Sequence, residues 1–507
     1  MGNCVSSNAD DGNRSKENTL PQDGEREIGS WRNNERRRVL QSMARVGSRV
    51  FKPASVVGPN RAGLKEYKAS TYDHVHDIVN LGIECYHVNN ATVEGNGNND
   101  GTRKLSGKVG LVNMGNTCFM NSSLQCLSNT IPLTDYFLGY DYRSEINLDN
   151  FLGTKGALVS SYAEVIKHLW LGSNPSFKPD EFKSNLELFA PQFEGYEQQD
   201  AQELLAFLLD GIHEDLNRVK NCPYIEDKDS DGTNDEGDAV LAWSNYLQRN
   251  MSIIVDLFQG QLRNTMVCRN DDQRQPDGSY GCGHRNVKFD PFMYLSLPIS
   301  DECNTLEDCL NLFCQEELLS GDEKWYCPKC KTHVEATKKI DLWMLPPILI
   351  IHLKRFKFCS SGQRSKIDRS IQYPLNDWDL SSVKKSSAGV DPLYDLYAVS
   401  HHRGNVGFGH YTAQAKNRFD GKWYDFNDSQ CHQIEPSKEN LGSGPSAYCL
   451  FYNRVERVVE NGNEAKRNTI IRRQSANRPE LWPHLQRATV ALWKSTRLEF
   501  DRPEMDE

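Results

Sequence analysis

The residues GLVNMGNTCFMNSSLQCL, 110–127, contain the most informative pattern in this sequence. Cys118 follows a Gly-Asn-Thr turn, and the residues after it place Met120, Leu124 and Leu127 at steps of three and four. Apolar residues at this spacing lie on one face of a helix. The pattern therefore predicts a helix that begins near Cys118 and turns its apolar face toward a core.

A cysteine at the start of a helix is chemically distinctive. The helix N-terminus presents positive potential and free N–H groups, which favour thiolate over thiol. A thiolate at Cys118 is a competent nucleophile, provided that a histidine accepts and returns protons. Asn113, five residues upstream, is placed to donate a side-chain N–H to a developing oxyanion. A single cysteine is more often a small buried hydrophobe, and we interpret Cys126 in that way.

A candidate histidine lies far downstream in GFGHYTAQAKN, residues 407–417. His410 stands there between a Gly-rich turn and a predicted strand, and glycines let a chain approach a substrate backbone closely. Asn427 and Asp428 follow 17 and 18 residues later. Either side chain can orient the imidazole as the third member of a triad. A hairpin with His410 on one strand and Asn427 on the next would bring the two together.

The remaining periodic segments predict an α+β protein. Residues 199–216 carry apolar positions at helical spacing and predict a second, longer helix. The segment PPILIIHLKRFKF, residues 346–358, alternates in character and predicts a strand with one or both faces buried. Three later segments are predicted to form successive antiparallel strands, namely 394–402, 410–416 and 422–428. Helices that precede strands in this way are typical of the α+β class.

The chain has 507 residues and a formal net charge of −10 at pH 7, but the charge is uneven. Residues 31–52 sum to +6 and residues 466–497 sum to +7, so the rest of the chain sums to −23. An acidic body argues against a nucleic-acid-binding core and for a positively charged partner. The most apolar stretch, residues 343–353, contains two prolines and falls short of the about 18 apolar residues of a membrane-spanning helix.

The sequence begins MGNCVSS, which matches an acylation signal. Gly2 followed by Ser6 fits the N-myristoylation pattern, and Cys4 is a candidate for palmitoylation. One acyl chain anchors a protein only marginally, and the basic segment 31–52 adds about 1 kcal/mol for each Lys or Arg near an anionic leaflet. We therefore predict that residues 1–55 form a disordered, acylated segment that tethers a cytoplasmic protein to an anionic membrane surface. The alternative is an untethered tail that happens to start Met-Gly.

Four motifs of this chain resemble those of one known family. NMGNTCFMNSSLQCL resembles the Cys box of the ubiquitin-specific proteases, and YDLYAVSHHRGNVGFGHYTAQAKNRFDGKWYDFND resembles their His box. QQDAQELLAFLLDGIHEDLNR and PPILIIHLKRFKF are similar to family motifs in the same order. The resemblance implies a papain-like cysteine protease with thumb, palm and fingers subdomains and an antiparallel sheet in palm and fingers. The predicted regions are an acylated segment at 1–55, a linker or extension at 56–106, the catalytic domain at 107–456 with fingers at about 255–345, and a basic, mostly disordered tail at 457–507.

The resemblance also implies roles for residues that match the family's motifs. Cys118 matches the nucleophile, His410 the general base and acid, and Asn113 the oxyanion donor. Asn427 stands where the family usually places Asp and sometimes Asn, while Asp428 matches the adjacent carboxylate, so both remain candidates for the third member. The residues implied to contact the ubiquitin tail are Gln199, Asp200, Gly409 and Tyr411. Asp200 is equally well placed to be the N-terminal Asp of the predicted helix.

Two cysteine pairs suggest a structural zinc site. Fifteen cysteines in a chain without a secretory signal are expected to be reduced, so some are available as ligands. Cys327 and Cys330 have zinc-knuckle spacing, and a zinc ribbon needs a second pair. The family resemblance points to Cys268 and Cys282 for that pair. The alternatives are His284 as a competing donor, or a degenerate ribbon that has lost its metal.

Two classes of function fit these observations, and a third is more remote. The first is a deubiquitinating cysteine protease that needs no cofactor for catalysis and cleaves the thioester, amide or isopeptide bond after the C-terminal Gly of ubiquitin at a membrane surface. The second is a membrane-tethered ubiquitin-binding adaptor without catalysis. The third is an unrelated papain-like protease, which would cleave ordinary peptides.

Overall fold

The computed structural model of this chain describes residues 107–226, 230–269, 282–358, 364–386, 392–405, 407–436, 441–460 and 463–468. Every described residue belongs to one unit of the chain, which lies within Lys65–Glu507. The predicted lipidation sites Gly2 and Cys4, the segments 1–55 and 56–106, and the tail beyond Asn468 lie outside the described residues.

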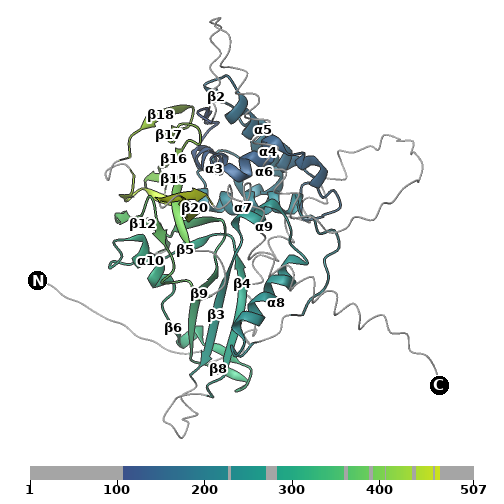
Figure 1. Ribbon diagram of the computed structural model, residues 1–507, viewed down its shortest axis with the longest axis vertical. Coiled ribbons are helices and arrows are strands. Elements are labelled where there is room, and N and C mark those ends of the chain that lie inside the picture. The colour runs from purple at the N-terminus through teal and green to yellow at the C-terminus, as the bar shows by residue number, and fades with distance from the viewer. Residues whose placement is uncertain are drawn as a thin grey trace, which may run out of the picture. The chain divides into compact units, whose positions relative to one another are not determined.

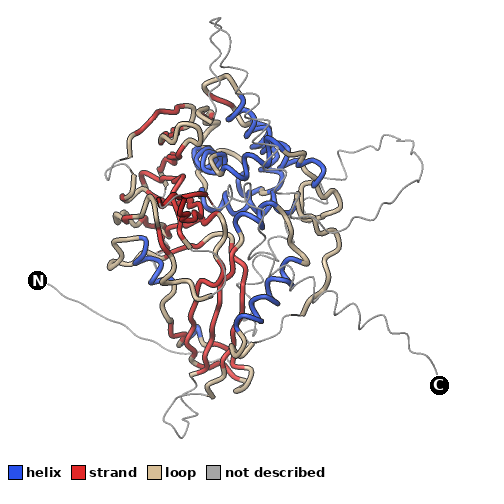
Figure 2. Tube along the Cα trace, viewed as in Figure 1, coloured by secondary structure: helices blue, strands red, loops and turns tan. Residues whose placement is uncertain are grey.

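The first part of the described chain forms a layer of helices. These are α3 (Cys118–Ser128), α4 (Ile131–Gly139), α5 (Ala157–Leu171), α6 (Asp180–Phe189), α7 (Ala201–Asp215) and α9 (Ile253–Phe258), with the short 3-10 helices η1 (Tyr142–Glu145) and η2 (Pro191–Phe193). Helix α3 packs on α4 and α7, and α5 packs on α4, α6 and α7. Figures 1 and 2 show these helices gathered on one side of a large sheet. The short strands β1 (Gly110–Leu111) and β2 (Ser176–Phe177) pair in parallel beside them.

The large sheet, which we call the palm sheet, comes mainly from the C-terminal part of the described chain. Its strands lie in the order β18 (Gln430–Ile434), β17 (Trp423–Asn427), β16 (Gly409–Lys416), β15 (Leu393–Gly404), β20 (Ala447–Glu460), β10 (Ile348–Leu353) and β5 (Leu295–Leu297). Neighbouring strands are antiparallel except for β10 and β5, which are parallel. The additional strands β14 (Trp378–Asp379) and β21 (Asn463–Asn468) pair with β15 and β20. The β20–β21 pairing carries regular structure beyond residue 456, the predicted end of the catalytic domain.

Apolar cores cover both faces of the palm sheet. Every residue of β10 is buried, with Ile348 and Ile350 in the core that includes the helical layer. Leu349 and Ile351 belong to a second core on the opposite face. Because successive side chains of a strand point to opposite faces, a strand of this composition must be covered on both sides. Helix α10 (Leu306–Phe313) contributes to the second core.

A second antiparallel sheet, which we call the fingers sheet, extends from the palm sheet. It consists of β4 (Arg285–Phe292), β3 (Gly260–Cys268), β9 (Ala336–Met344) and β6 (Glu317–Leu319) in that order. Helix α8 (Asp235–Leu247) packs on β4, as Figure 1 shows. A small hairpin of β7 (Trp325–Cys327) and β8 (Thr332–Val334) follows, after η3 (Gly321–Glu323). The remaining strand pairs are β11 (Phe356–Phe358) with β12 (Arg364–Lys366), and β13 (Ile371–Gln372) with β19 (Ser443–Gly444).

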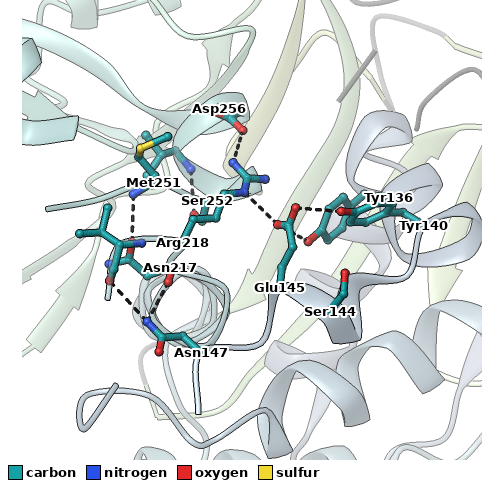
Figure 3. Close-up of polar contacts among 12 residues, drawn as sticks. Tyr136, Tyr140, Ser144, Glu145, Asn147, Asn217, Arg218, Met251, Ser252 and Asp256 are labelled. Atoms are coloured by element: carbon teal, nitrogen blue, oxygen red, sulfur yellow. Dashed lines mark hydrogen bonds and ion pairs between the residues drawn. The ribbon is translucent and has the colours of Figure 1, made fainter. Parts of the chain in front are cut away.

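Polar contacts add to the apolar packing of the helical layer. The guanidinium of Arg218 donates to Glu145 at 3.0 Å and to Asp256 at 3.1 Å, as Figure 3 shows. Glu145 also accepts hydrogen bonds from the hydroxyls of Tyr136 and Tyr140. Burial works against the charge of Arg218, but Asp256 and Glu145 outweigh it and raise the pKa of the guanidinium. The cluster links helices α4 and α9 to the segment that follows α7.

The structure confirms the predicted α+β class and most of its elements. Helix α7 occupies the segment predicted as the longer helix, and β15, β16 and β17 are adjacent antiparallel strands as predicted. The parallel pairing of β5 with β10 is an exception within a predicted antiparallel sheet. In the part of the chain that the structure describes, no helix has both the length and the apolar character needed to cross a bilayer.

The predicted continuous strand over residues 346–358 is interrupted at Arg355. This side chain is fully buried, and its guanidinium donates to the backbone carbonyls of Ala447, Ile367, Arg369 and Gly444. A buried cation needs such acceptors because it has lost its water. Strand β10 ends before Arg355, and β11 starts directly after it. The prediction of one continuous strand was therefore wrong at Arg355, because the alternation of apolar residues does not reveal the hydrogen bonds that interrupt the strand there.

Candidate active site

Cys118 is the first residue of helix α3, and its side chain is only 3% exposed. Burial raises the pKa of the Cys118 thiol, and the charge of Asp428 adds to that rise. Backbone N–H groups of Tyr411, Phe119 and Cys118 itself act in the opposite direction. Burial therefore outweighs the effect of the helix N-terminus, which by itself would favour the thiolate. A partner that accepts the proton is needed to ionise this thiol.

Asn113 lies in the turn before α3, and its carboxamide is held by several contacts. The carboxamide oxygen accepts hydrogen bonds from the backbone N–H groups of Gly115 at 3.0 Å and Thr117 at 3.1 Å. The carboxamide nitrogen donates to Asp428 at 3.0 Å. Gly115 and Asn116 have φ of 101° and 55°, a region that glycine and asparagine adopt most readily. A carboxamide nitrogen carries two hydrogens, so one remains for a further acceptor.

His410 and Asn427 come from neighbouring strands and meet directly. His410 is the second residue of β16, and Asn427 is the last residue of the antiparallel strand β17. Nε2 of His410 lies 2.7 Å from Oδ1 of Asn427. Because an amide oxygen only accepts, Nε2 carries the hydrogen and Nδ1 is left with a free lone pair. The backbone N–H of Tyr411, the next residue in β16, contacts the Cys118 thiol.

Asp428 takes a different position from Asn427. Oδ1 of Asp428 accepts from Asn121 at 2.8 Å, and Oδ2 accepts from Asn113 at 3.0 Å. The same Oδ2 atom lies 4.0 Å from Nε2 of His410. The backbone carbonyl of Asp428 accepts from the N–H of Leu111 at 2.8 Å. The two candidates for the third triad position are therefore separated. Asn427 makes the short contact with His410, and Asp428 ties the turn before Cys118 to the end of β17.

Gly409 and Tyr411 flank His410 in β16, and both are constrained by His402 of β15. A Cβ atom added at Gly409 would overlap Nε2 of His402. The ring of Tyr411 is buried, with its centroid 4.6 Å from that of His402 and 5.9 Å from that of Tyr448. A side chain at residue 409 would therefore collide with His402 of the protein itself. The predicted close approach of a substrate at this glycine stays a prediction.

Asp200 caps helix α7, the alternative weighed from the sequence. Its carboxylate accepts from the N–H of Gln202 at 2.8 Å and from the hydroxyl of Tyr448 at 2.7 and 2.6 Å. Burial raises the pKa of Asp200, although the Tyr448 hydroxyl opposes that rise. The side chain of Gln199 donates to the backbone carbonyl of Gln192 in η2 at 3.0 Å. This hydrogen bond joins two residues that are close in sequence.

Two groups of residues that build this site are not apparent from the sequence. Gln198 makes two hydrogen bonds to the backbone of Gly409, and Asn121 bonds to Asp428 from within α3. Gln198 and Gln199 are adjacent in the QQD motif, and the sequence does not show which of the two side chains contacts the strand that carries His410. His402 and Tyr448 are buried beneath the site, and only the tertiary structure shows that they contact Tyr411.

The four predicted metal ligands form a cluster at the tip of the fingers sheet. The ligand atoms of Cys268, Cys282, Cys327 and Cys330 all lie within 4.8 Å of one another, so the group could hold a metal ion. The sulfur of Cys268 is 3.8 Å from that of Cys330, and the sulfur of Cys282 is 3.6 Å from that of Cys327. Burial opposes ionisation, but the N–H of His284 and the neighbouring thiols lower the pKa of Cys282 to about 7.

His284, the competing donor, is not a member of this cluster. Its ring stacks on that of Trp325, with centroids 6.1 Å apart and planes inclined by 9°. Its backbone carbonyl accepts from the N–H of Cys268 at 2.9 Å, which fixes the hairpin that carries two of the cysteines.

The fold and the site together define a class. A buried cysteine at a helix N-terminus, beside a histidine and an asparagine on an antiparallel sheet, is the arrangement of the papain-like α+β proteins. Within that class, the chain belongs to the ubiquitin carboxyl-terminal hydrolase family, whose model matches residues 109–452.

Individual relatives agree with this family. The chain is 40% identical over 355 residues to ubiquitin carboxyl-terminal hydrolase 2 of Homo sapiens and of Rattus norvegicus, covering 69% of this chain and 56% and 54% of those proteins. It therefore spans about half the length of these curated relatives. It is also similar to a solved structure titled "Structure of the SAGA Ubp8/Sgf11/Sus1/Sgf73 DUB module bound to ubiquitin aldehyde", with a TM-score of 0.53 and 26% identity, covering 74% of this chain and 75% of that one.

The overlap with His402 predicts that Gly409→Ala destabilises the protein and lowers activity. Overpacking of this kind costs about 1–3 kcal/mol, and a shift of β16 moves His410 as well. Gly407→Ala is the matched control, because a Cβ there meets nothing within 4 Å. Thermal unfolding of both variants measures the difference. Equal unfolding temperatures for the two would contradict the packing that we describe.

Proposed function

We propose that this protein is a thiol-dependent deubiquitinating hydrolase that cleaves the bond after the C-terminal Gly of ubiquitin. The proposal rests chiefly on one observation. In a chain of this family, the Cys118 thiol lies at the start of α3 beside the strand that carries His410, and His410 is oriented by Asn427. Each reacting position of the family's motifs is filled, which favours an enzyme over a silent adaptor.

The proposed reaction begins with proton transfer from Cys118 to Nδ1 of His410, whose lone pair is left free by the Nε2–Asn427 bond. The thiolate attacks the carbonyl carbon of the terminal Gly and forms a tetrahedral oxyanion. The oxyanion collapses to a thioester as the leaving amine takes the proton from the imidazolium. Water, activated by Nδ1, then attacks the thioester, which releases the carboxylate of ubiquitin and returns the proton to the thiol.

The oxyanion is proposed to accept a hydrogen bond from Asn113. One hydrogen of its carboxamide nitrogen is directed to Asp428, and the second is available. The bonds from Gly115 and Thr117 hold the carboxamide oxygen, so the group is oriented before substrate arrives. Donors held in advance in this way are worth about 10²–10³ in kcat.

In many triads one aspartate both orients the histidine and stabilises the imidazolium by its charge. We propose that two residues share these roles here. Asn427 fixes the tautomer and orientation of His410 but adds no charge. Asp428, 4.0 Å from Nε2, adds a negative charge that stabilises the imidazolium. The same charge raises the pKa of Cys118, so Asp428 disfavours a thiolate without its imidazolium partner.

The proposed substrate is ubiquitin, free or conjugated. The structure titled as bound to ubiquitin aldehyde supports this choice, as does the acidic balance of the body of the chain, which sums to −23 outside its two basic flanks. The family resemblance implies a basic ubiquitin tail that must enter an acidic channel. Gln199, Asp200, Gly409 and Tyr411 remain proposed contacts of that tail, and nothing in the proposal calls for nucleic acid.

Activity on a ubiquitin C-terminal fluorogenic amide tests this function. We expect hydrolysis by the wild type and none by Cys118→Ala, because the nucleophile is lost. Asn427→Ala and Asp428→Ala should each lose part of the activity, the first through His410 orientation and the second through charge and the Asn113 contact.

Three results would count against the assignments. Equal inactivity of wild type and Cys118→Ala, with ubiquitin still bound, would favour the adaptor. Cleavage of ordinary peptides lacking a ubiquitin body would favour an unrelated papain-like protease. Normal turnover by the Asn427→Ala, Asp428→Ala double variant would remove both residues from the mechanism.

We further propose that the four-cysteine cluster holds a structural zinc ion. A tetrahedral zinc with Zn–S distances of about 2.3 Å places its sulfurs about 3.8 Å apart. The sulfur–sulfur separations of 3.8 Å for Cys268 and Cys330 and 3.6 Å for Cys282 and Cys327 fit that geometry. The ion would hold Cys268 at the end of β3 and Cys327 at the end of β7 together with Cys282 and Cys330. It would take no part in bond cleavage.

Metal content of the full chain tests the zinc proposal. We expect about one zinc per chain, and Cys327→Ser should lower both zinc content and the unfolding temperature because a thiolate ligand is lost. Cys222→Ser is the control, since Cys222 is exposed and outside the cluster. Wild-type protein that carries no stoichiometric metal when purified without chelator would disprove the site.

Finally, we propose that the N-terminus anchors this cytoplasmic protein at an anionic membrane surface, with myristate on Gly2, palmitate on Cys4 and the basic segment 31–52 acting together. These residues are supported by the sequence pattern alone. Cell fractionation of the full chain should find wild type in the membrane fraction and Gly2→Ala mostly in the soluble fraction, with Cys4→Ser between them. An identical soluble distribution of all three would remove the anchoring claim.

A further inference from the structure

The segment Tyr196–Asp200, which we call the strap, connects the two elements that carry the reacting side chains. At one end, the carboxamide of Asn116 donates to the carbonyl of Tyr196 at 2.8 Å. Asn116 lies two residues before Cys118, in the turn that opens α3. At the other end of the strap, Asp200 caps α7 and accepts from the hydroxyl of Tyr448.

Between these anchors, Gln198 binds the backbone of Gly409 with both ends of its carboxamide. Its nitrogen donates to the Gly409 carbonyl at 2.9 Å, and its oxygen accepts from the Gly409 N–H at 3.1 Å. The two hydrogen bonds hold the two peptide groups on either side of the Gly409 Cα, because each bond requires its own distance and angle. Gly409 immediately precedes His410, so the restraint acts on the residue that sets the direction of the imidazole.

His402 restrains the same glycine from another direction. Its ring occupies the space that a side chain at Gly409 would fill. Gly409 is therefore held by Gln198 of the strap and by packing on β15. Asn116 binds the same strap. The strap therefore contacts both the turn before Cys118 and the start of β16, in addition to the direct packing of α3 on the palm sheet.

We propose that Gln198 is a positioning residue, which holds His410 in line with Cys118 through its paired hydrogen bonds to Gly409. The proposal rests on the proposed thiol hydrolase function for its kinetic effect. Cys118 and His410 belong to different elements, and a misplacement of about 1 Å between reacting groups can lower a rate about 10²-fold. The residue acts through the backbone before His410 and touches neither the thiol nor the imidazole in its described contacts.

Three substitutions separate the hydrogen bonds from the bulk of the side chain. Gln198→Met keeps the length of the side chain but removes donor and acceptor. Gln198→Glu keeps the acceptor for the Gly409 N–H and places a carboxylate against the Gly409 carbonyl. Gln192→Met, on an exposed position of η2, controls for the chemical change itself. Unfolding temperatures within a few degrees of wild type show that each variant is folded.

The first readout is steady-state hydrolysis of the ubiquitin fluorogenic amide. We expect Gln198→Met to lower kcat roughly tenfold while KM changes by about twofold or less, with Gln198→Glu affected at least as strongly. The control should match wild type. A rise in KM with unchanged kcat would overturn the proposal, because it would make Gln198 a substrate contact.

The second readout needs no ubiquitin, so it distinguishes failure of this proposal from failure of the proposed function. The rate of alkylation of Cys118 by iodoacetamide is followed against pH by peptide mapping, with His410→Ala defining the rate without the imidazole. We expect Gln198→Met to slow alkylation near pH 7 severalfold and to move the profile toward higher pH, because the imidazole no longer accepts the proton well. A Gln198→Met profile identical to wild type would overturn the positioning role. A wild type that fails to hydrolyse the amide, with alkylation still dependent on Gln198, would reject the function alone.

Discussion

The packing of helix α3 on strands β15, β16 and β17 is the contact on which the rest of the structure depends. Met120, Leu124 and Leu127 are fully buried in the core that also contains Ala413 and Phe426 of the sheet. This packing brings the first residue of the helix to the strand that carries His410, although the two are far apart in the chain. The helical layer supplies Cys118, the sheet supplies His410, and an apolar contact brings the two elements together.

Polar groups refine what the apolar core brings together. Asp428 binds Asn121 inside α3 and Asn113 before it, which fixes the helix against the end of β17. Gln198 binds the backbone of Gly409, the residue before His410. Apolar packing tolerates small shifts because it has no preferred direction, whereas hydrogen bonds fail outside a narrow range of angle and distance. The precision required of a catalytic site therefore resides in the polar contacts.

The Cys118 environment favours a neutral resting state over a preformed thiolate. Burial and the charge of Asp428 both raise the pKa of the thiol, and the helix N–H groups offset only part of that rise. In the proposed reaction, ionisation of Cys118 is coupled to proton transfer to His410, because an imidazolium supplies the positive charge that the thiolate needs. The division of labour between Asn427 and Asp428 follows from the same balance, because the group nearest the imidazole carries no charge.

The sequence by itself determined the α+β class, the helix at Cys118, the strands around His410 and Asn427, and the four cysteines that gather in the fingers sheet. The helix and the strands depend on local periodicity, and Cys327 and Cys330 on their spacing, which a linear chain displays directly. Cys268 and Cys282 were predicted from the family resemblance. The tertiary structure alone decided which of Asn427 and Asp428 meets His410, why residue 409 is a glycine, why the strand over 346–358 breaks at Arg355, and that Gln198 rather than Gln199 binds Gly409. Each of these depends on a partner distant in sequence, and one side chain gives no sign of which distant group will satisfy it.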